Sequence, residues 1–408
     1  MRNIWYLMLL AAVSGCGNET QVTQPTESLT HRKPNPRYLV VNLSATLGGK
    51  ISVGTSINNR DWAAGFSNQS GDATVHAALW RHGSILDLGT LGGPNSNVQW
   101  PGQNDRGMIV GIAEIGRMDP LKENWSCSAF FPSVTHHICR GFVWQHGVMK
   151  RLPTLGGNHG FATGVNNRGQ VVGWAETRVH DPTCNAPQVL QFRAVMWVPK
   201  KDLKRELPPL RGDSTSAATA INDRGQVVGI SGDCDVAVGQ LSARHAVLWD
   251  HGRAKDIGNL GGEAWHTPMA INERGDIVGF SNPAGVPGID FAPHAFLWTK
   301  RHGIQDLGKF PGDDFSQAFA INEHRQVVGR SCGPGGCRAF LWQDGVMRDL
   351  NQLIGPRYPN VLTAGRDIND AGKITGNFVK QSNGKILPFV ATPVHGHHAV
   401  EALTSPQP

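Results

Sequence analysis

The sequence lacks the motifs that mark common enzymes and cofactor sites. It contains no G-x-S-x-G, H-E-x-x-H, P-loop or G-x-G-x-x-G motif and no acidic calcium loop. No C-x-x-C pair occurs, which argues against zinc ribbons and thioredoxin-type sites. Lys and Arg are scattered despite a net charge of +6, whereas a nucleic-acid groove would concentrate them. We therefore predict no catalytic residue, cofactor or metal site from sequence motifs, and we expect no nucleic-acid partner.

No apolar run is long enough for a permanent membrane helix. The N-terminus is typical of a secretory signal peptide. The run from Ile4 to Val13 follows Arg2 and precedes small residues. Val13-Ser14-Gly15-Cys16 resembles the bacterial lipobox, which implies cleavage after residues 1–15 and a lipid on the Cys16 thiol. An ordinary signal peptide with a chance cysteine is the alternative. Residues 16–37 then form a polar, proline-bearing tether. We expect a lipoprotein of the bacterial outer membrane or cell surface, with its lipid anchor as the sole membrane contact.

What the sequence has in abundance is glycine, turns and an internal repeat. "AINERGDIVG" (270–279) resembles "AINDRGQVVG" (220–229) and "AINEHRQVVG" (320–329). Alignment on the turn asparagine gives successive intervals of 46, 62, 56, 50, 50 and 47 residues, so seven copies fill residues 38–392. The aligned asparagines are Asn58, Asn104, Asn166, Asn222, Asn272, Asn322 and Asn369.

Each copy contains four short β-type segments separated by turn signals, which indicates an antiparallel meander. Copy number and period predict an all-β fold: a seven-bladed β-propeller of four-stranded blades, with the "AIN" strand innermost and the "DLG" strand outermost. The last copy lacks a "DLG" strand, and residues 38–49 match that strand. We therefore predict that the N-terminal strand completes the last blade and closes the ring. Residues 393–408 are expected to be a disordered tail.

Two recurring side chains are better explained by structure than by chemistry. The Trp of "AFLW" occurs in six copies, and a large ring at a fixed blade position is typical of core between blades. The Asp of "DLG" recurs as Asp87, Asp256, Asp306 and Asp349. A catalytic carboxylate would not recur on the outer strand of several blades, so a structural hydrogen bond is expected.

The segments "HAFLW", "DLGTLGG" and "AIN-x-x-G-x-VVG" resemble the HAF repeat of extracellular bacterial proteins. His294-Ala295-Phe296 carries the triplet itself, and the similarity covers essentially residues 38–392. The resemblance implies an extracytoplasmic repeat protein and carries no agreed activity.

Length varies mainly in the loop between the second and third strands of each copy, and six cysteines lie in or beside these loops. An even count in an exported chain predicts disulfides. Cys127 and Cys139 share one loop, Cys332 and Cys337 flank "GPGG", and Cys184 and Cys234 occupy corresponding loops of adjacent copies. We predict these three pairs. They would stiffen the loop-rich face, where binding residues usually sit.

Candidate ligand contacts are the side chains that do not repeat. The insertion at 113–140 contributes Trp125, Phe130, Phe131 and His136, and the "LGG" side adds His159, Trp265 and His266. The alternative is that the aromatic residues of the insertion simply pack onto their blade. A metal site at His136, His137 and Cys139 is disfavoured because adjacent histidines diverge in an extended strand.

We predict a non-enzymatic binding or surface-interaction module, acting as a monomer on a glycan or protein ligand through the loop-rich face. The alternative is an enzyme acting on a carbohydrate or similar polymer at the channel mouth. Charged residues converging at the mouth would favour the enzyme. An aromatic face with scattered polar groups would favour the binding module.

Overall fold

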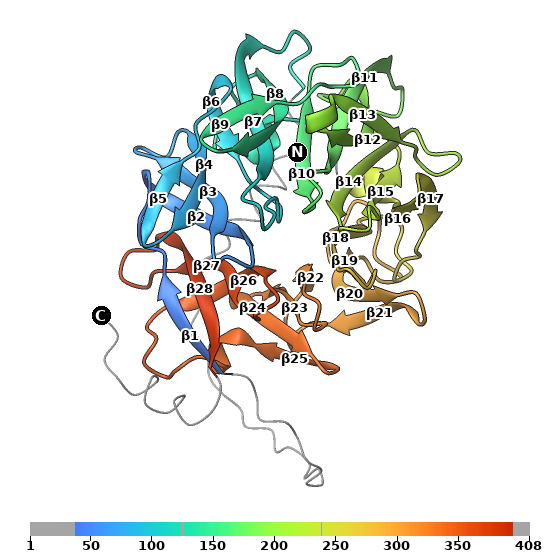
Figure 1. The fold of residues 1–408 in the computed structure, drawn as a ribbon. Coiled ribbons are helices and arrows are strands. Elements are labelled where there is room, and N and C mark those ends of the chain that lie inside the picture. Colours follow the sequence, from blue (N-terminus) through green and yellow to red (C-terminus); the bar gives the residue numbers. More distant parts are fainter. Residues whose placement is uncertain (1–36, 124–125, 238, 395–408) are drawn as a thin grey trace.

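Antiparallel sheets lie side by side around a common centre in a propeller-like arrangement (Figure 1). The computed structural model describes residues 37–123, 126–237 and 239–394. Five sheets have four strands each, and a further sheet has eight. The eight-stranded sheet consists of two parts joined by a single parallel bridge between Ile51 and Ile386. The predicted all-β class with four-stranded antiparallel sheets is confirmed.

Chain order is kept within every four-stranded sheet, so each sheet is a simple meander. The strands of the first three repeats are β2 (Gly48–Ile57), β3 (Ala63–Gln69), β4 (Val75–Arg81), β5 (Ser84–Asp87), β6 (Gly92–Asn97), β7 (Ile109–Met118), β8 (His137–Gln145), β9 (Val148–Arg151), β10 (Gly160–Val165), β11 (Val171–His180), β12 (Leu190–Val198) and β13 (Leu203–Leu207). Those of the next three are β14 (Thr215–Ile221), β15 (Val227–Gly232), β16 (His245–Asp250), β17 (Arg253–Asp256), β18 (Thr267–Ile271), β19 (Ile277–Ser281), β20 (His294–Thr299), β21 (Gly303–Gly308), β22 (Phe315–Ile321), β23 (Val327–Gly333), β24 (Gly336–Gln343) and β25 (Val346–Asp349).

The two ends of the described chain meet in one sheet. After β26 (Val361–Ile368), β27 (Ile374–Val379) and β28 (Ile386–Val394), the outer position is taken by β1 (Arg37–Asn42). β1 runs antiparallel to β28, from the pair Arg37–Val394 to the pair Asn42–Phe389. Figure 1 shows the blue N-terminal strand beside the red C-terminal one. Short 3-10 turns complete the fold at η2 (Ser128–Phe130), η3 (Pro199–Lys201), η4 (Gln240–Ala243) and η5 (Leu350–Gln352).

The repeated phrase forms the hairpin between the first two strands of each sheet. In the copy at 270–279, Asn272 Oδ1 accepts hydrogen bonds from the backbone N–H groups of Arg274 and Asp276. Gly275 has a φ of +82°, a left-handed conformation that glycine adopts at little cost. A Cβ at Gly279 would collide with the carbonyl oxygen of Thr267 on the neighbouring strand. The predicted turn and close approach are therefore both present.

The turn asparagines also bond from one repeat to the next. Each side-chain Nδ2 donates to the backbone carbonyl of the next turn asparagine, over distances of 2.9 to 3.2 Å. The following residue makes a second series, in which its backbone N–H donates to the next repeat's side-chain oxygen at 2.6 to 3.2 Å. Both series run from Asn58 and Asn59 through every copy and return to them. We call these two series the asparagine belt.

The recurring tryptophans are core residues between sheets, as predicted. Trp298 is buried in a cluster with Val228 and Leu248 of the preceding sheet. The indole N–H of Trp197 donates to the carbonyl of Pro153 at 2.9 Å. The Asp of "DLG" is structural too: Asp306 lies 2.8 Å from the Nδ1 of His294 and accepts from the N–H of Gly308. The histidine of the "HAF" triplet thus pairs with the aspartate of "DLG".

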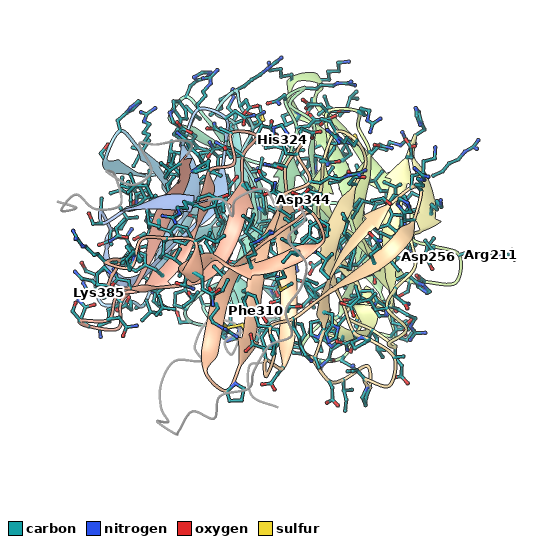
Figure 2. All side chains as sticks on the ribbon, turned by 90° about the horizontal axis from the view of Figure 1, so that it is seen from below. Arg211, Asp256, Phe310, His324, Asp344 and Lys385 are labelled. Carbon is teal, nitrogen blue, oxygen red and sulfur yellow. A yellow bond between two sulfur atoms is a disulfide. The ribbon has the colours of Figure 1, made fainter. Side chains whose placement is uncertain are left out.

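The two ends of the molecule differ in character. Figure 2 places His324, in a repeated asparagine turn, and Asp344, in the turn after "AFLW", toward one end. Phe310, in the loop that leaves an outer strand, lies toward the other end. The tight turns and the "LGG"-type loops therefore lie at opposite ends. The three disulfides lie in or beside the loops between second and third strands, which the antiparallel strand order places at the same end as the "LGG"-type loops.

Candidate ligand-binding cavity

A central cavity of about 110 Å³ opens on the loop side, between the first strands of several sheets. β2, β18, β22 and β26 contribute side chains from their inner faces, and the segment 129–132 covers part of the opening. Met269 borders this cavity and also a second one of about 210 Å³ that the asparagine turns surround. The two cavities therefore lie next to each other along the centre of the ring of sheets, and Met269 borders both.

Trp100 and Phe130 line one part of the cavity, and Phe161 packs against both without bordering it. The ring centroids of Trp100 and Phe130 are 5.8 Å apart, and Phe161 lies edge-on to both at 5.1 and 4.9 Å. The carbonyl of Phe130 accepts a 3.0 Å hydrogen bond from the buried Asn97 amide. The Cys127–Cys139 disulfide ties the segment before Phe130 to β8. The insertion is therefore held in place over the cavity.

Two arginines also line the cavity. Arg330 on β23 donates from Nε to Gln317 Oε1 at 2.9 Å, and its guanidinium lies 5.7 Å from the ring centroid of Phe319. Arg366 on β26 lies 4.6 Å from the same ring, with its Nε 3.4 Å from Asn377 Oδ1. Burial lowers the pKa of Arg330 to about 9, helped by the charge of Arg366, and burial lowers the pKa of Arg366 to about 10. Both groups are nonetheless cationic at neutral pH.

The predicted contact residues divide into two groups. Phe130, Phe131 and Trp265 border the cavity, all three largely buried. His136 is partly exposed and does not border it. Trp125 lies outside the described residues, as do Cys16 and the signal segment.

His159 and His266 are buried inside the protein rather than directed at the cavity. The Nδ1 of His266 lies 2.8 Å from Ser281 Oγ and its Nε2 lies 3.1 Å from the carbonyl of Gly262. Burial lowers the pKa of His266 to about 4, so the ring is neutral. Sequence position alone placed these residues on the loop side, but it did not show that their rings turn into the sheets.

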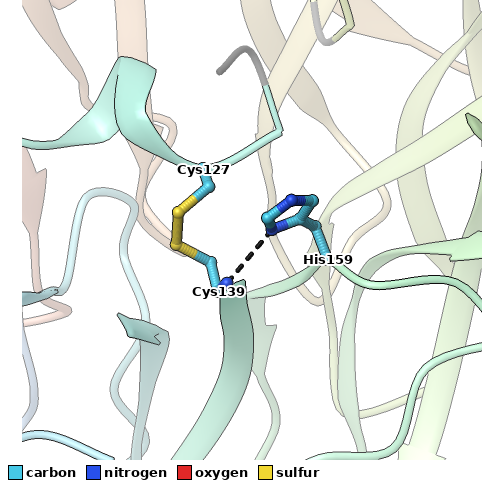
Figure 3. Close-up of side chains that lie close together, drawn as sticks. All are labelled: Cys127, Cys139 and His159. Carbon is cyan, nitrogen blue, oxygen red and sulfur yellow. Dashed lines mark hydrogen bonds between the residues drawn. A yellow bond between two sulfur atoms is a disulfide. The ribbon is translucent and has the colours of Figure 1, made fainter. Parts of the chain in front are cut away.

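His159 belongs to a buried polar cluster that attaches the insertion to the third sheet. The backbone N–H of Cys139 donates to its Nδ1 at 3.1 Å (Figure 3). Its Nε2 lies 3.2 Å from Asp119 Oδ2. Glu123 Oε1 accepts from the backbone N–H groups of Val189 and Leu190. Because Cys139 donates to Nδ1, the proton of the neutral ring sits on Nε2 and faces Asp119.

The cluster of Asp119, Glu123 and His159 brings three possible metal ligands within 4.8 Å of one another. Zinc would need an unprotonated imidazole nitrogen, and the bond from Cys139 already occupies the lone pair of Nδ1. Asp119 accepts backbone N–H bonds from Leu121 and Glu123 as well. Cys127 and Cys139 also lie close to His159, but their sulfur atoms form a disulfide and cannot bind a metal as thiolates. The donor set therefore fits a structural network better than a metal site.

All three predicted disulfides are present: Cys127–Cys139, Cys184–Cys234 and Cys332–Cys337. The second joins loops of adjacent repeats across 50 residues, and the third closes the hairpin between β23 and β24. None of the helices in the part of the chain that the structure describes has the length and apolar character needed to cross a bilayer.

The sequence does contain a signal for the two arginines, in the breaks of the repeat. Arg330 follows the Gly of "VVG", where the first five copies have a large apolar residue. Arg366 stands three residues before the turn asparagine, where other copies have Thr, Pro, Met or Phe. These strand positions alternate with the small residues that pack between sheets, so they point to the channel.

No family model matches the chain, and no curated protein matches it. Among solved structures, the chain is similar to Porphyromonas gingivalis dipeptidyl peptidase 4, with a TM-score of 0.38 and 9% identity over 85% of this chain. The chain spans about half of the length of that protein, 53%. Similarity at this level indicates nothing about what this chain binds.

Proposed function

We propose that the protein is an exported binding or surface-interaction module without catalytic activity, built on a seven-bladed β-propeller and anchored to the bacterial cell surface by a lipid on Cys16. The observation that carries the proposal is the lining of the loop-side cavity. It consists of aromatic and aliphatic side chains, amides, one threonine and two arginines. Among the described residues that line it there is no Asp, Glu, His, Ser or Cys to act as acid, base or nucleophile.

Seven blades and ring closure are supported by the asparagine belt, whose seven Nδ2 bonds join all seven turn asparagines in one cycle. The pairing of β1 with β28 supplies an outer strand for the last repeat. On this interpretation the eight-stranded sheet is two blades that touch at the Ile51–Ile386 bridge.

Export is supported by the disulfides, which persist in oxidising compartments. The lipid anchor and the HAF-repeat relationship rest on sequence motifs alone. Mass spectrometry of the mature protein, expressed in a bacterium with a lipoprotein pathway, would test the anchor. A diacylated N-terminal Cys16 is expected, and an unmodified cysteine or a cleavage elsewhere would refute it.

The binding function is tested by screening the full chain against arrays of glycans and extracellular proteins. Phe130→Ala removes an aromatic side chain from the cavity wall, so captured ligands should be lost or strongly reduced. Val148→Ala, an exposed position on the outer strand β9, serves as the matched control. Ligands retained equally by both variants would place binding elsewhere. A blank array together with turnover of a polysaccharide would favour the enzyme instead.

A further inference from the structure

We propose that the loop-side cavity binds a small organic anion with a flat apolar body, such as an aromatic carboxylate, and that Arg366 holds the acid group. This inference rests on the proposed function, because it names the ligand class of the same cavity. Three independent features of the cavity support it: its charge, its size and its buried hydrogen-bond donors.

The charge of the cavity is positive and one-sided. Arg366 and Arg330 lie on the same wall, and no carboxylate borders the cavity among the described residues. Arg366 contacts the neutral Asn377 and the face of Phe319, and it forms no ion pair with a carboxylate of the described chain. Arg366 is partly buried, and a cation that is partly withdrawn from water is stabilised by an accompanying anion. A ligand carboxylate would form the charge-assisted hydrogen bonds for which a guanidinium is suited.

The size and walls of the cavity fit one aromatic ring. Its volume is about 110 Å³, below the roughly 150 Å³ of an apolar protein cavity that takes up benzene, so a single ring would fill it and part of the ligand would lie in the opening. Phe66, Phe280 and Met269 also border it, and Phe319 lies beneath the Arg366 guanidinium. A ring could stack within these walls while its acid group reaches Arg366.

The buried donors of the cavity also require acceptor atoms. Trp100 and Trp265 both border the cavity, and the Nε1 of each is buried without a hydrogen-bond partner. Buried N–H groups without partners are uncommon in proteins. A ligand oxygen that comes within reach of either indole would accept from its Nε1–H, and a carboxylate offers about four acceptor sites. Asn97 Oδ1 is likewise buried and unpaired, which suits a hydroxyl or N–H on the ligand body.

Calorimetry on the full chain with three probes tests the inference: phenylacetate, its neutral analogue phenylacetamide, and inorganic phosphate. Phenylacetate should bind, and phenylacetamide should bind roughly tenfold or more weakly because it lacks the charge that Arg366 recognises. Arg366→Met should weaken phenylacetate binding by a similar factor and bring it to the level of the amide. Arg168→Met, at an exposed turn on the opposite end, should bind like the wild type.

Several outcomes would overturn the inference, and they separate it from the proposed function. Equal binding of acid and amide, or phenylacetate binding unchanged by Arg366→Met, would refute the anion while leaving the cavity as a binding site. Phosphate binding as tight as that of phenylacetate would refute the apolar body. No binding of any probe alongside a Phe130-dependent array ligand would refute this inference alone. If neither the calorimetry nor the array shows binding, both this inference and the proposed binding function are refuted. If Arg366→Met fails to fold, two measurements still test the inference. They are phenylacetate binding by Arg366→Lys and the difference in affinity between phenylacetate and phenylacetamide for the wild type.

Discussion

The side-chain amide of Asn369 donates a 3.1 Å hydrogen bond to the backbone carbonyl of Asn58, 311 residues earlier in the chain. The same contact recurs between every other pair of successive turn asparagines, but there the partners are only 46 to 62 residues apart. The Asn369–Asn58 bond is therefore one of several contacts between the last repeat and the first, together with those of Asp367 to Ile57 and Asp370 to Asn59.

Changing Asn369 should weaken this junction while leaving its hairpin intact. Asn369→Asp keeps the Oδ1 that accepts from the backbone N–H of Lys373, but it replaces the Nδ2 donor with an oxygen facing the Asn58 carbonyl. We expect the free energy of unfolding to fall by about 1–3 kcal/mol, the usual cost of a buried group losing its partner. Denaturant unfolding followed by fluorescence measures the change.

Asn383→Asp is the matched control for that substitution. Asn383 is exposed and its Oδ1 accepts from the backbone N–H of Lys385, outside the asparagine belt. Its stability should stay within about 0.5 kcal/mol of the wild type. If Asn369→Asp were equally neutral, the belt would not contribute measurably to joining the ends.

The three disulfides should differ in what they contribute to stability. Cys184–Cys234 spans 50 residues and Cys332–Cys337 spans 5, so the first restricts the unfolded chain more. The loop-entropy relation gives about 4 kcal/mol for the longer loop and about 2 kcal/mol for the shorter one. Double Cys→Ala variants, compared by denaturant unfolding, should show that order. Equal losses, or a larger loss at Cys332–Cys337, would contradict the entropic explanation.

The repeat made most of the scaffold predictable from sequence. Six of the seven copies contain the hairpin, the tryptophan and the outer strand in the same order, so the sheet order and the disulfide pairs could be predicted from position alone. The belt was not foreseen, because an asparagine that caps its own turn through Oδ1 gives no sign that Nδ2 reaches the next repeat.

The cavity was harder to predict because it combines positions from distant repeats. Phe130 and Trp265 stood out as aromatic residues that do not repeat, and both border it. His159 stood out for the same reason, yet its ring turns inward to Cys139 and Asp119. Ring orientation depends on local hydrogen bonds that sequence spacing does not specify. Arg366 could be found only by comparing the channel-facing positions of all copies.

Metal ions should not stabilise the cluster around His159. The N–H of Cys139 bonds Nδ1, and the proton on Nε2 faces Asp119, so no nitrogen lone pair is open to a metal. Treatment with EDTA and then addition of zinc should leave the melting temperature of the full chain unchanged. The His159→Ala variant should melt lower than the wild type, because it leaves a cavity and unpaired groups. Zinc stabilising the wild type but not His159→Ala would reverse this assignment.

Stability should depend on pH through Asp367, which stands two residues before the turn asparagine, where all six other copies have Gly, Ala or Ser. Its Oδ2 accepts a 2.7 Å bond from the backbone N–H of Ile57, and its Oδ1 accepts from its neighbour Ile368. Burial nevertheless raises the pKa of this carboxyl to about 7, from 3.8. The folded protein therefore holds the proton more tightly than the unfolded chain does, and this group's contribution to stability falls as pH rises from about 4 to about 7.

Asp367→Asn isolates that contribution, because an amide oxygen can still accept from Ile57 but the side chain cannot ionise. Relative to the wild type, the variant should gain stability between pH 5 and pH 8. Asp367→Ala should lose stability at both pH values, because it leaves the Ile57 N–H without its partner. Denaturant unfolding of all three proteins at the two pH values provides the measurement. A wild type and Asp367→Asn pair whose difference in stability is the same at pH 5 and pH 8 would show that Asp367 ionises equally in both states. Asp367 would then accept the hydrogen bond from Ile57 without a measurable cost of burying its charge.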